Sequence, residues 1–378
     1  MPPASAKQPP ILAPTGRYWP ALDGLRGLAV LAVMLFHAQV PQVVGGFAGV
    51  DIFFVLSGFL ITSQLMQELH QSGHIRWGRF FMRRLLRLQP ALLLLLLTYI
   101  LGWIAGWIPG PGSTVTRDVS IVLLAMTHWA RALDWYPPDY LGHAWSLGIE
   151  EQFYLLWALL LAAMGRYATR RWSVLALALA GTLAGMLWML WLHTAGAKPV
   201  RLYNGLDTRA MALLCGCALA SWLHTRRPER LDNVPLPSHL VSHSRAVSYT
   251  GMMALALLLL GMSSLEWHNS LMFPWGYMAI AVTATLLVWS LVLAPSGLCS
   301  AILAWPPLVA VGKISYGLYL WHYPLFRVAE AKALEADIPV AYAMGLASGL
   351  AAMAAWVSFV AVELPLRKRL AWRYRHTA

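Results

Sequence analysis

Long apolar runs, separated by short polar or basic segments, recur along the whole of this 378-residue chain. Each run approaches the roughly 20 residues that an α-helix needs to cross a bilayer core. The pattern predicts about ten transmembrane helices, at residues 26–43, 50–67, 86–108, 144–165, 173–194, 206–224, 248–265, 274–294, 307–326 and 340–362. A shorter apolar segment, 119–133, lies between Pro-rich stretches and fits a re-entrant or interfacial helix better than a span. The expected fold is an all-α, polytopic integral membrane bundle.

The charged residues support this interpretation. The chain is 59% hydrophobic and 12% charged, with a formal net charge of +12. Its Lys and Arg residues lie in short clusters between apolar runs, where membrane topology explains them better than binding to nucleic acid. Basic loops alternate with loops poor in Lys and Arg, so the positive-inside rule predicts that both termini are cytoplasmic.

The same pattern suggests the domain boundaries. Residues 1–17 are polar and Pro-rich and do not form a signal peptide, which predicts a disordered cytoplasmic tail. We expect one transmembrane domain over 18–370, with a cytoplasmic loop at 225–247, and a basic tail at 371–378. The three cysteines lie in or beside apolar segments, so we expect neither a disulfide framework nor a metal site.

Two polar residues share one face of the first apolar segment. His37 lies about midway along it, and Arg26 lies 11 residues earlier, which brings both to within about 20° of the same face. They stand about 16 Å apart along the helix axis. Charged and titratable side chains are costly in lipid, so both should face a protein interior or a wet cavity. The structural alternative is that His37 is a hydrogen-bonded core residue.

Other polar residues interrupt the later apolar runs. They are Asp51, Ser57, His143, Ser146, Glu150, Glu151, Tyr154, Asp207, Arg209, Ser315, Tyr316, Tyr319 and His322, together with the basic run Arg83, Arg84 and Arg87. Structural roles compete here too. Asp51 can cap its helix, Asp207 and Arg209 can form an ion pair, and the basic run can anchor α-helical segments at the cytoplasmic surface.

Seven of these segments stand in a fixed order, namely LDGLRGLAV, GVDIFFVLSGFLI, RRLLRLQP, WSLGIEEQFYLLW, LDTRAMALLCGCALA, ISYGLYLWHYPL and VELPLRK. Together they resemble the membrane acyltransferase-3 family of O-acyltransferases, over about residues 17–370. The Arg and His that mark the first helix of the family are matched by Arg26 and His37. Two features depart from the family pattern. Met211 stands where relatives often carry Asp, and no SGNH-type hydrolase-like domain follows, so we expect a stand-alone form.

The resemblance implies transfer of an acyl group, acetyl above all, from acyl-CoA on the cytoplasmic side of a bacterial plasma membrane to a hydroxyl of a carbohydrate or glycosylated acceptor. A sugar hydroxyl has a pKa far above 7, so a general base helps, and a neutral imidazole is the usual choice. We assign His37 as this base, with Glu150 as the carboxylate that orients its ring or stabilises its charged form.

The same resemblance suggests the binding residues. The phosphates of CoA suit bidentate arginine, and the candidates are Arg26, Arg83, Arg84 and Arg87. On the acceptor side the candidates are Asp51, Asp207, Arg209 and His322. Acyl-CoA is a co-substrate here, and we expect no permanently bound cofactor and no metal.

Two other functions remain open. Buried Arg, Glu and His also serve proton relays, so a transporter or flippase of a small solute or lipid-linked sugar is the main alternative. However, the repeat symmetry common in transporters is not evident. A non-catalytic membrane partner is the third possibility, which the Arg26–His37 pair disfavours. No nucleophile elbow, Walker A motif or G-x-G-x-x-G loop is present, which disfavours nucleotide hydrolysis and hydride transfer.

Overall fold

The structure, a computed structural model, describes residues 18–170, 172–226 and 244–366. Within these ranges the regular elements are helices, and no β-strand occurs. Eight helical segments are long and apolar enough to cross a membrane, namely Pro20–His37, Pro41–Ser72, Trp77–Ile104, Gly142–Met164, Ser173–Thr194, Pro199–Thr225, Arg245–Ser264 and Val340–Leu366. The predicted all-α polytopic membrane bundle is confirmed. The two predicted tails and most of the predicted loop 225–247 lie outside the described residues.

The helices follow one another along the chain with short connections. In order they are α1 (Pro20–His37), α2 (Ala48–Ser72), α3 (Trp77–Ile104), α4 (Gly112–Leu123), α5 (Thr127–Ala132), α6 (Trp145–Met164), α7 (Ser173–Thr194), α8 (Pro199–Asn204), α9 (Leu206–Arg226), α11 (Ser244–Ser264), α12 (Tyr277–Leu293), α13 (Leu298–Leu303), α14 (Pro306–Lys313), α15 (Ser315–Glu335) and α16 (Val340–Ser358). Short 3₁₀ turns precede α2 and α6, at η1 (Pro41–Val43) and η2 (Gly142–Ala144), and a third follows α6, at η3 (Gly165–Thr169). One π-helical turn, η4 (Met272–Gly276), precedes α12, and a second, η5 (Phe359–Glu363), follows α16.

Two predicted spans take a different form in the structure. The span predicted at 274–294 corresponds to α12, which is apolar but only 17 residues long. The span predicted at 307–326 is two helices, because the chain breaks at Ile314 between α14 and α15. The second of these, α15, continues to Glu335 and carries charged residues in its last turns. Apolar periodicity did not reveal this break because both helices are apolar on either side of it.

The first helix also ends earlier than predicted. It spans Pro20–His37, so His37 is its last residue and does not lie midway along it. The next residues explain this end. Gln39 adopts a left-handed backbone with φ of 58°, and Pro41 cannot donate the backbone hydrogen bond that a continuing helix requires. His37 therefore lies at the end of a helix, where neighbouring elements converge on it.

The segment 119–133 is not one helix. It is divided between α4 and α5, and Ala125 turns the chain between them with φ of 54°. Neither piece is among the eight segments long enough to span a membrane. These short helices pack beside α3, α6 and α8, in keeping with the prediction of a segment that does not cross the bilayer.

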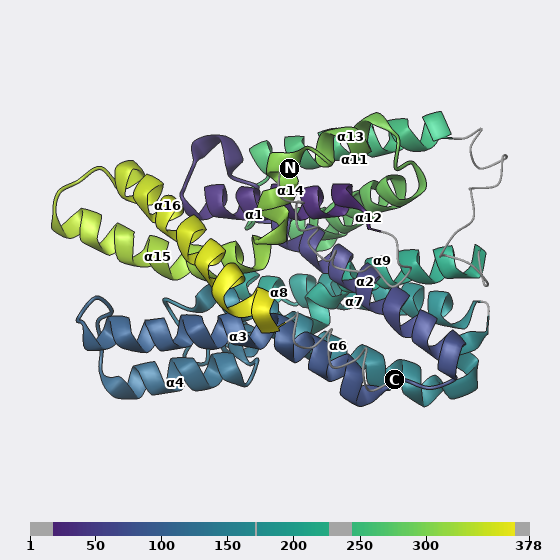
Figure 1. Cartoon of the computed structure of the whole chain (residues 1–378), viewed down its shortest axis with the longest axis horizontal. Coiled ribbons are helices and arrows are strands. Elements are labelled where there is room, and N and C mark those ends of the chain that lie inside the picture. The colour runs from purple at the N-terminus through teal and green to yellow at the C-terminus, as the bar shows by residue number, and fades with distance from the viewer. Residues whose placement is uncertain (1–17, 171, 227–243, 367–378) are drawn as a thin grey trace, which may run out of the picture.

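Close helix contacts at small residues hold the bundle together. A Cβ atom at Gly58 of α2 would lie 1.9 Å from the carbonyl oxygen of Leu213 in α9, and one at Gly216 of α9 would lie 2.0 Å from that of Val55 in α2. Only glycine permits this approach, as is common between helices in membranes. In Figure 1 the α2–α9 pair lies toward the right of the view, and the α15–α16 hairpin extends to the left.

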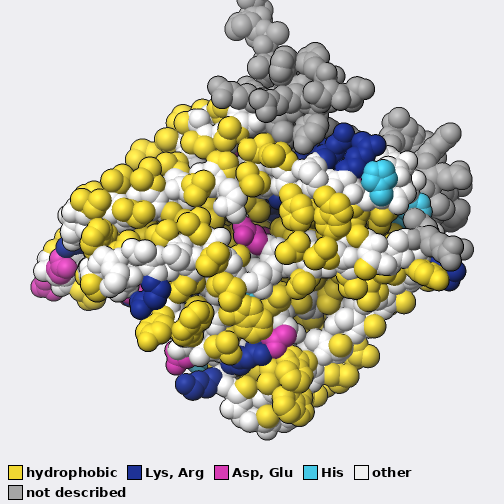
Figure 2. Space-filling view, turned by 90° about the horizontal axis from the view of Figure 1, so that it is seen from below, with side chains coloured by type: hydrophobic (Ala, Val, Ile, Leu, Met, Phe, Trp, Pro, Cys, Tyr) yellow, Lys and Arg dark blue, Asp and Glu magenta, His cyan; other side chains and the backbone are white. Residues whose placement is uncertain are grey.

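The outward faces of the long helices are apolar. Leu93, Leu97 and Leu101 recur every four residues on α3 and are about half exposed, as are Leu179 and Leu183 on α7. Figure 2 shows hydrophobic side chains over most of one face, with Lys and Arg gathered in a few clusters. A soluble surface of this kind would associate or aggregate, whereas in a bilayer it faces lipid tails. The chain is an integral membrane protein.

Candidate active site

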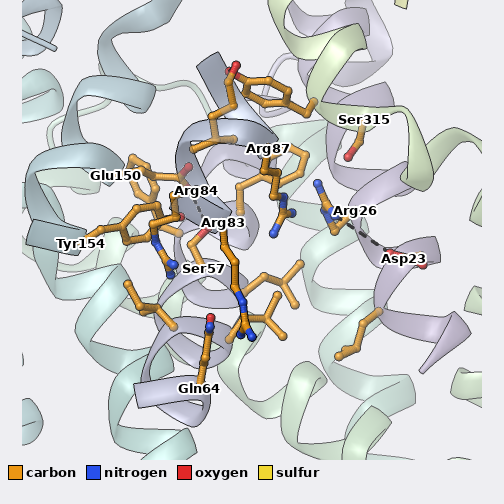
Figure 3. A pocket seen from close by; sticks show the side chains of 18 of the residues that line it. Asp23, Arg26, Ser57, Gln64, Arg83, Arg84, Arg87, Glu150, Tyr154 and Ser315 are labelled. Atoms are coloured by element: carbon orange, nitrogen blue, oxygen red, sulfur yellow. Dashed lines mark hydrogen bonds and ion pairs between the residues drawn. The ribbon is translucent and has the colours of Figure 1, made fainter. Parts of the chain in front are cut away.

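A cavity of about 610 Å³ opens between α1, α2, α3, α6 and α15. Its wall follows α2 from Val50 to Ser72, a distance of about 33 Å at 1.5 Å per helical residue. The lining of the cavity therefore runs along nearly the whole length of α2. Figure 3 shows side chains from α1, α2, α3 and α6 pointing toward one another within it.

Arginine dominates the polar lining of the cavity. One Arg comes from α1, one directly precedes α3, and four lie in the first half of α3; in chain order they are Arg26, Arg76, Arg79, Arg83, Arg84 and Arg87. Arg79, Arg83 and Arg87 are four residues apart, so they share one face of α3. Like charges at this spacing repel one another, and an anionic ligand would relieve that repulsion. All four arginines that the sequence predicted for donor binding lie in this one cavity.

Neighbouring side chains fix two of these arginines. The guanidinium carbon of Arg84 lies 4.2 Å from the ring centre of Phe80 and 4.6 Å from that of Tyr154. Arg26 Nη1 lies 4.0 Å from Asp23 Oδ1, one turn earlier on α1. These contacts hold the planar guanidinium groups before any ligand arrives, which lowers the entropy lost on binding.

Three acidic residues line the cavity with these arginines, namely Asp23, Glu68 and Glu150, and Glu150 comes from α6. Its Oε1 accepts a hydrogen bond of 2.6 Å from the Ser57 hydroxyl of α2. In Figure 3 its side chain lies on the same side of the cavity as Tyr154 and Arg84, with Arg87 nearby. Glu151, the next residue, points elsewhere and accepts a hydrogen bond from Gln89 Nε2 at 3.0 Å. Of this carboxylate pair, Glu150 belongs to the cavity.

Hydroxyl groups line another part of the cavity wall. They belong to Ser57, Ser146, Ser315, Tyr316 and Tyr319. The Tyr319 hydroxyl donates to the His143 carbonyl oxygen at 2.9 Å and lies 2.6 Å from Ser146 Oγ. A tyrosine hydroxyl has one proton, so the second hydrogen bond is donated by Ser146. Two hydrogen bonds therefore hold the Tyr319 hydroxyl in place.

Three histidines meet beyond Tyr319 and outside the cavity lining. They come from the end of α1, from η2 and from α15. The ring centres of His37 and His322 are 5.4 Å apart, and those of His143 and His322 are 5.6 Å apart. The ring of Tyr323 lies 4.9 Å from His37 and 5.1 Å from His143. We call these four residues the histidine cluster.

Hydrogen bonding indicates the protonation of one member of the cluster. His322 Nδ1 lies 3.1 Å from the Leu318 carbonyl oxygen. A carbonyl only accepts, so this nitrogen carries the proton and Nε2 is a free acceptor in the neutral ring. Within the described residues, His322 Nε2 and both ring nitrogens of His143 are buried without a hydrogen-bond partner. The cluster thus offers imidazole nitrogens that are ready to bind or move a proton.

The short helix α5 brings a cation to this cluster. A Cβ atom at Gly142 would lie 2.7 Å from Arg131 Nη1 and 3.6 Å from the Tyr323 hydroxyl, so glycine lets both approach. Arg131 Nε also donates to Asn204 Oδ1 at 3.0 Å. On the same helix, burial lowers the pKa of His128 to about 4, so this imidazole is neutral at physiological pH. Arg131 is thus the charged group that α5 contributes.

The two residues assigned as base and orienting carboxylate lie in different places. Glu150 contacts Ser57 in the cavity, whereas the ring contacts of His37 are with Phe36, His322 and Tyr323. Among the described residues no contact joins Glu150 to His37. The physical reason is that Glu150 and His37 lie at different levels along the helix bundle. Arg26, which shares the cavity with Glu150, lies about 16 Å from His37 along α1. His322 takes the place next to His37 that the sequence analysis gave to Glu150.

Three residues predicted for acceptor binding are engaged elsewhere. Arg209 Nη2 lies 2.8 and 2.9 Å from the two carboxylate oxygens of Asp51, and both side chains are fully buried. The rings of Tyr277 and Tyr203 lie 4.0 and 5.0 Å from the Arg209 guanidinium carbon. This ion pair joins α2 to α9 and is not part of the cavity lining.

Asp207 has a different partner from the one considered for it. Its carboxylate accepts hydrogen bonds from Arg201 at 2.9 and 2.5 Å and from the Trp188 indole at 2.6 Å. Asp207 and Arg209 are two positions apart on α9, so their side chains point about 200° apart. The structural ion pair is therefore Asp51–Arg209, and Asp207 pairs with α8.

The sequence patterns predicted no site role for His143, Tyr319 or Tyr323, although His143 and Tyr319 are among the polar residues that interrupt apolar runs. Tyr319 and Tyr323 lie within the motif ISYGLYLWHYPL, and His143 lies two residues before the motif WSLGIEEQFYLLW. One signal was available. Tyr319, His322 and Tyr323 are three and four residues apart and so share a face of one helix. His143 had no such signal, because only the fold brings it to that face.

Comparisons with known proteins show which family the chain resembles. Residues 19–362 match the family model described as an acyltransferase domain, Acyl_transf_3. The chain is 32% identical over 360 residues to the O-acetyltransferase OatA of Staphylococcus aureus, which covers 93% of this chain. It is 35% identical over 358 residues to YrhL of Bacillus subtilis, a protein provisionally designated a peptidoglycan O-acetyltransferase, again over 93% of this chain.

The similarity covers only part of these relatives. The matched region is 58% of OatA and 55% of YrhL, so the chain spans a little over half the length of each. No solved structure matches the chain. The likeness therefore concerns the membrane domain that contains both the cavity and the histidine cluster.

Proposed function

Because the chain belongs to the acyltransferase-3 family, we propose that it is a membrane O-acyltransferase that moves an acetyl group from acetyl-CoA to a hydroxyl of a carbohydrate or glycosylated acceptor. One observation carries the proposal. An elongated cavity lined by six arginines adjoins, across Tyr319, a cluster of three histidines. An anionic donor and a general base thereby have separate but neighbouring places.

The cavity suits the shape and charge of acyl-CoA. Its arginines can form bidentate, charge-assisted hydrogen bonds with the phosphates. Its length along α2, about 33 Å, leaves room for the extended pantetheine arm to carry the thioester toward Ser57 and Tyr319. Glu150 and Ser57 lie along this path and can position Arg87 and the pantetheine arm.

The sidedness of the cavity follows from the predicted topology. The connection between α2 and α3, which ends at Arg76, the first α3-side arginine of the series, belongs to the predicted cytoplasmic loops. Acyl-CoA is a cytoplasmic metabolite, so it would enter at this end. Single cysteines at His74 and Ser113, which lie on either side of α3, should therefore react with an impermeant maleimide from opposite faces of the membrane.

The histidine cluster supplies the proton chemistry. In the proposed step His37 takes the proton of the acceptor hydroxyl as its oxygen attacks the thioester carbonyl. A new C–O bond forms, the C–S bond breaks, and the CoA thiolate recovers the proton from the imidazolium. General-base assistance of this kind contributes about 10²–10⁴ in rate. His322 and Tyr323 hold the His37 ring, and the Arg131 cation can stabilise the negative charge that develops on the carbonyl oxygen.

The names of the relatives guide the choice of acceptor. YrhL is named for O-acetylation of peptidoglycan, a carbohydrate polymer, so a sugar hydroxyl is the acceptor class we propose for this chain. A lipid-linked sugar is the form that can reach a site within the bilayer without help from a second enzyme.

The proposal is tested with purified protein in lipid nanodiscs. Acetyl-labelled acetyl-CoA is supplied with mono- and disaccharide or lipid-linked acceptors, and both CoA release and label on the acceptor are measured. Acceptor-dependent release with matching transfer is the expected result. Movement of solute or lipid across proteoliposomes, with no CoA release under any acceptor, would instead favour the transporter.

A further inference from the structure

Tyr319 occupies a position that no other cavity residue shares. In the ring contacts of the described residues, it alone among the side chains that line the cavity also touches the histidine cluster. Its ring centre lies 5.7 Å from that of His143 and 5.5 Å from that of His322. Phe53, which lines the cavity, lies 6.2 Å away. Tyr319 therefore lies between the cavity and the histidine cluster.

The position of Tyr319 is fixed at the hydroxyl as well as at the ring. The hydroxyl donates to the His143 carbonyl and accepts from Ser146. His143, which belongs to the cluster, and Ser146, which lines the cavity, are close in sequence at the start of α6. Any movement of Tyr319 must therefore break two hydrogen bonds that join α15 to this turn.

The arginine cavity and the histidine cluster are reached from different directions. The arginine cavity extends to Ser72, the C-terminal residue of α2. The histidine cluster lies at the C-terminal end of α1, where His37 is the last residue. His37 and Tyr323 are partly exposed, whereas His143 and His322 are buried. A thioester in the cavity and a hydroxyl at the cluster would thus approach Tyr319 from opposite sides.

We infer that Tyr319 is a partition that closes the donor cavity from the histidine cluster and must be displaced for the acyl group to reach its acceptor. This inference rests on the proposed function for its purpose. With the partition in place, water at the cluster cannot reach the thioester. Without it, water replaces the acceptor: its oxygen forms the new C–O bond, the C–S bond breaks, and the products are the free acid and CoA thiol.

Cysteine labelling tests the partition without depending on catalysis. A cysteine is introduced in the cavity by Ser57→Cys, and a small charged methanethiosulfonate reagent is added to one face of sealed vesicles at a time. The unmodified chain, whose three cysteines are buried, gives the background. We call the membrane face nearer the arginine end of the cavity the arginine face, and the opposite one the cluster face. The expected result is labelling only when the reagent is added to the arginine face. Labelling of Ser57→Cys at equal rates from both faces overturns the inference, because no partition then exists.

The decisive variant combines Ser57→Cys with Tyr319→Ala. Labelling from the cluster face should rise several-fold, and Tyr319→Phe, which keeps the ring but loses both hydrogen bonds, should give a smaller rise. Tyr316→Ala is the matched control, since Tyr316 lies on the same helix, lines the same cavity and donates instead to the Leu88 carbonyl. Tyr316→Ala should not increase the labelling from the cluster face. If Tyr319→Ala and Tyr316→Ala give the same labelling, Tyr319 is not the partition.

A second measurement connects the partition to the reaction. Tyr319→Ala should raise CoA release in the absence of acceptor and lower the fraction of turnovers that acylate one, whereas loss of fold would lower both. If the wild-type protein releases no CoA with any acceptor but the labelling behaves as described, the proposed reaction fails and the partition stands. If the wild-type protein transfers acetyl and Tyr319→Ala shows no leak, the partition fails and the reaction stands.

Discussion

The arginine cavity and the histidine cluster lie at the two ends of α1 and differ in every physical respect. The cavity is lined by six positive side chains and has a volume of about 610 Å³. The cluster is built of imidazole and phenol rings whose contacting centres lie 4.9 to 6.3 Å apart, with the Arg131 guanidinium of α5 nearby. In the function proposed above, one region holds a large anion and the other moves a proton. The difference implies that donor binding and proton transfer can be damaged separately.

The largest separate effect is expected at His37. His37→Ala should abolish acyl transfer, because loss of a general base raises the barrier by about 3–5 kcal/mol. Acyl-CoA affinity should not change, since His37 is not part of the cavity lining. Turnover and equilibrium binding of a labelled acyl-CoA measure the two effects. Near-wild-type turnover in a normally expressed variant would make His37 structural.

A comparable loss, but in stability, is expected at the ion pair that belongs to neither region. Asp51→Ala leaves Arg209 as an uncompensated buried charge, which costs about 3–5 kcal/mol. Thermal unfolding in detergent should detect it as a lower Tm. If instead the variant keeps its Tm and loses affinity for the acceptor, Asp51 binds substrate, as the sequence pattern suggested.

A smaller effect is expected at Arg26, within the cavity. Arg26→Lys keeps the charge but loses the planar fork that binds phosphate through two hydrogen bonds. Loss of one charge-assisted hydrogen bond, about 1.5–3 kcal/mol, should raise the KM for acyl-CoA about tenfold or more. The rate at saturating acyl-CoA should be preserved. An equal loss at saturation would mean that Arg26 acts in the chemical step or in helix packing.

The smallest effect is expected at Ser57, which serves the cavity indirectly. Ser57→Ala removes the hydroxyl that donates to Glu150. A single hydrogen bond contributes about 0.5–1.5 kcal/mol, so donor affinity should fall by about two- to tenfold. Ser57→Thr, which retains the hydroxyl, is the control and should keep most of the affinity. Loss of turnover at saturating donor would place Glu150 closer to the proton chemistry than the structure indicates.

The sequence by itself determined the fold class and the residue types of the site. Apolar runs long enough to span lipid have few alternatives to helices, because the backbone must satisfy its own hydrogen bonds there. Charged and polar side chains cost free energy in the lipid core. Arginines near one membrane surface and isolated polar residues in apolar helices are therefore easy to recognise in the sequence. The arginines at 26, 83, 84 and 87 were predicted to bind one anionic ligand because the family resemblance implied acyl-CoA, and the fold brings them into one cavity.

Only the tertiary structure decided which residues meet. Helical periodicity tells which side chains share a face, but it does not tell which neighbour that face contacts or at what depth. Those depend on close approaches such as Gly58 to Leu213 and on where a helix stops, as α1 does at His37. For this reason Glu150 and His37 lie in separate regions, His143 joins a histidine far away in the chain, and Tyr319 stands between the two.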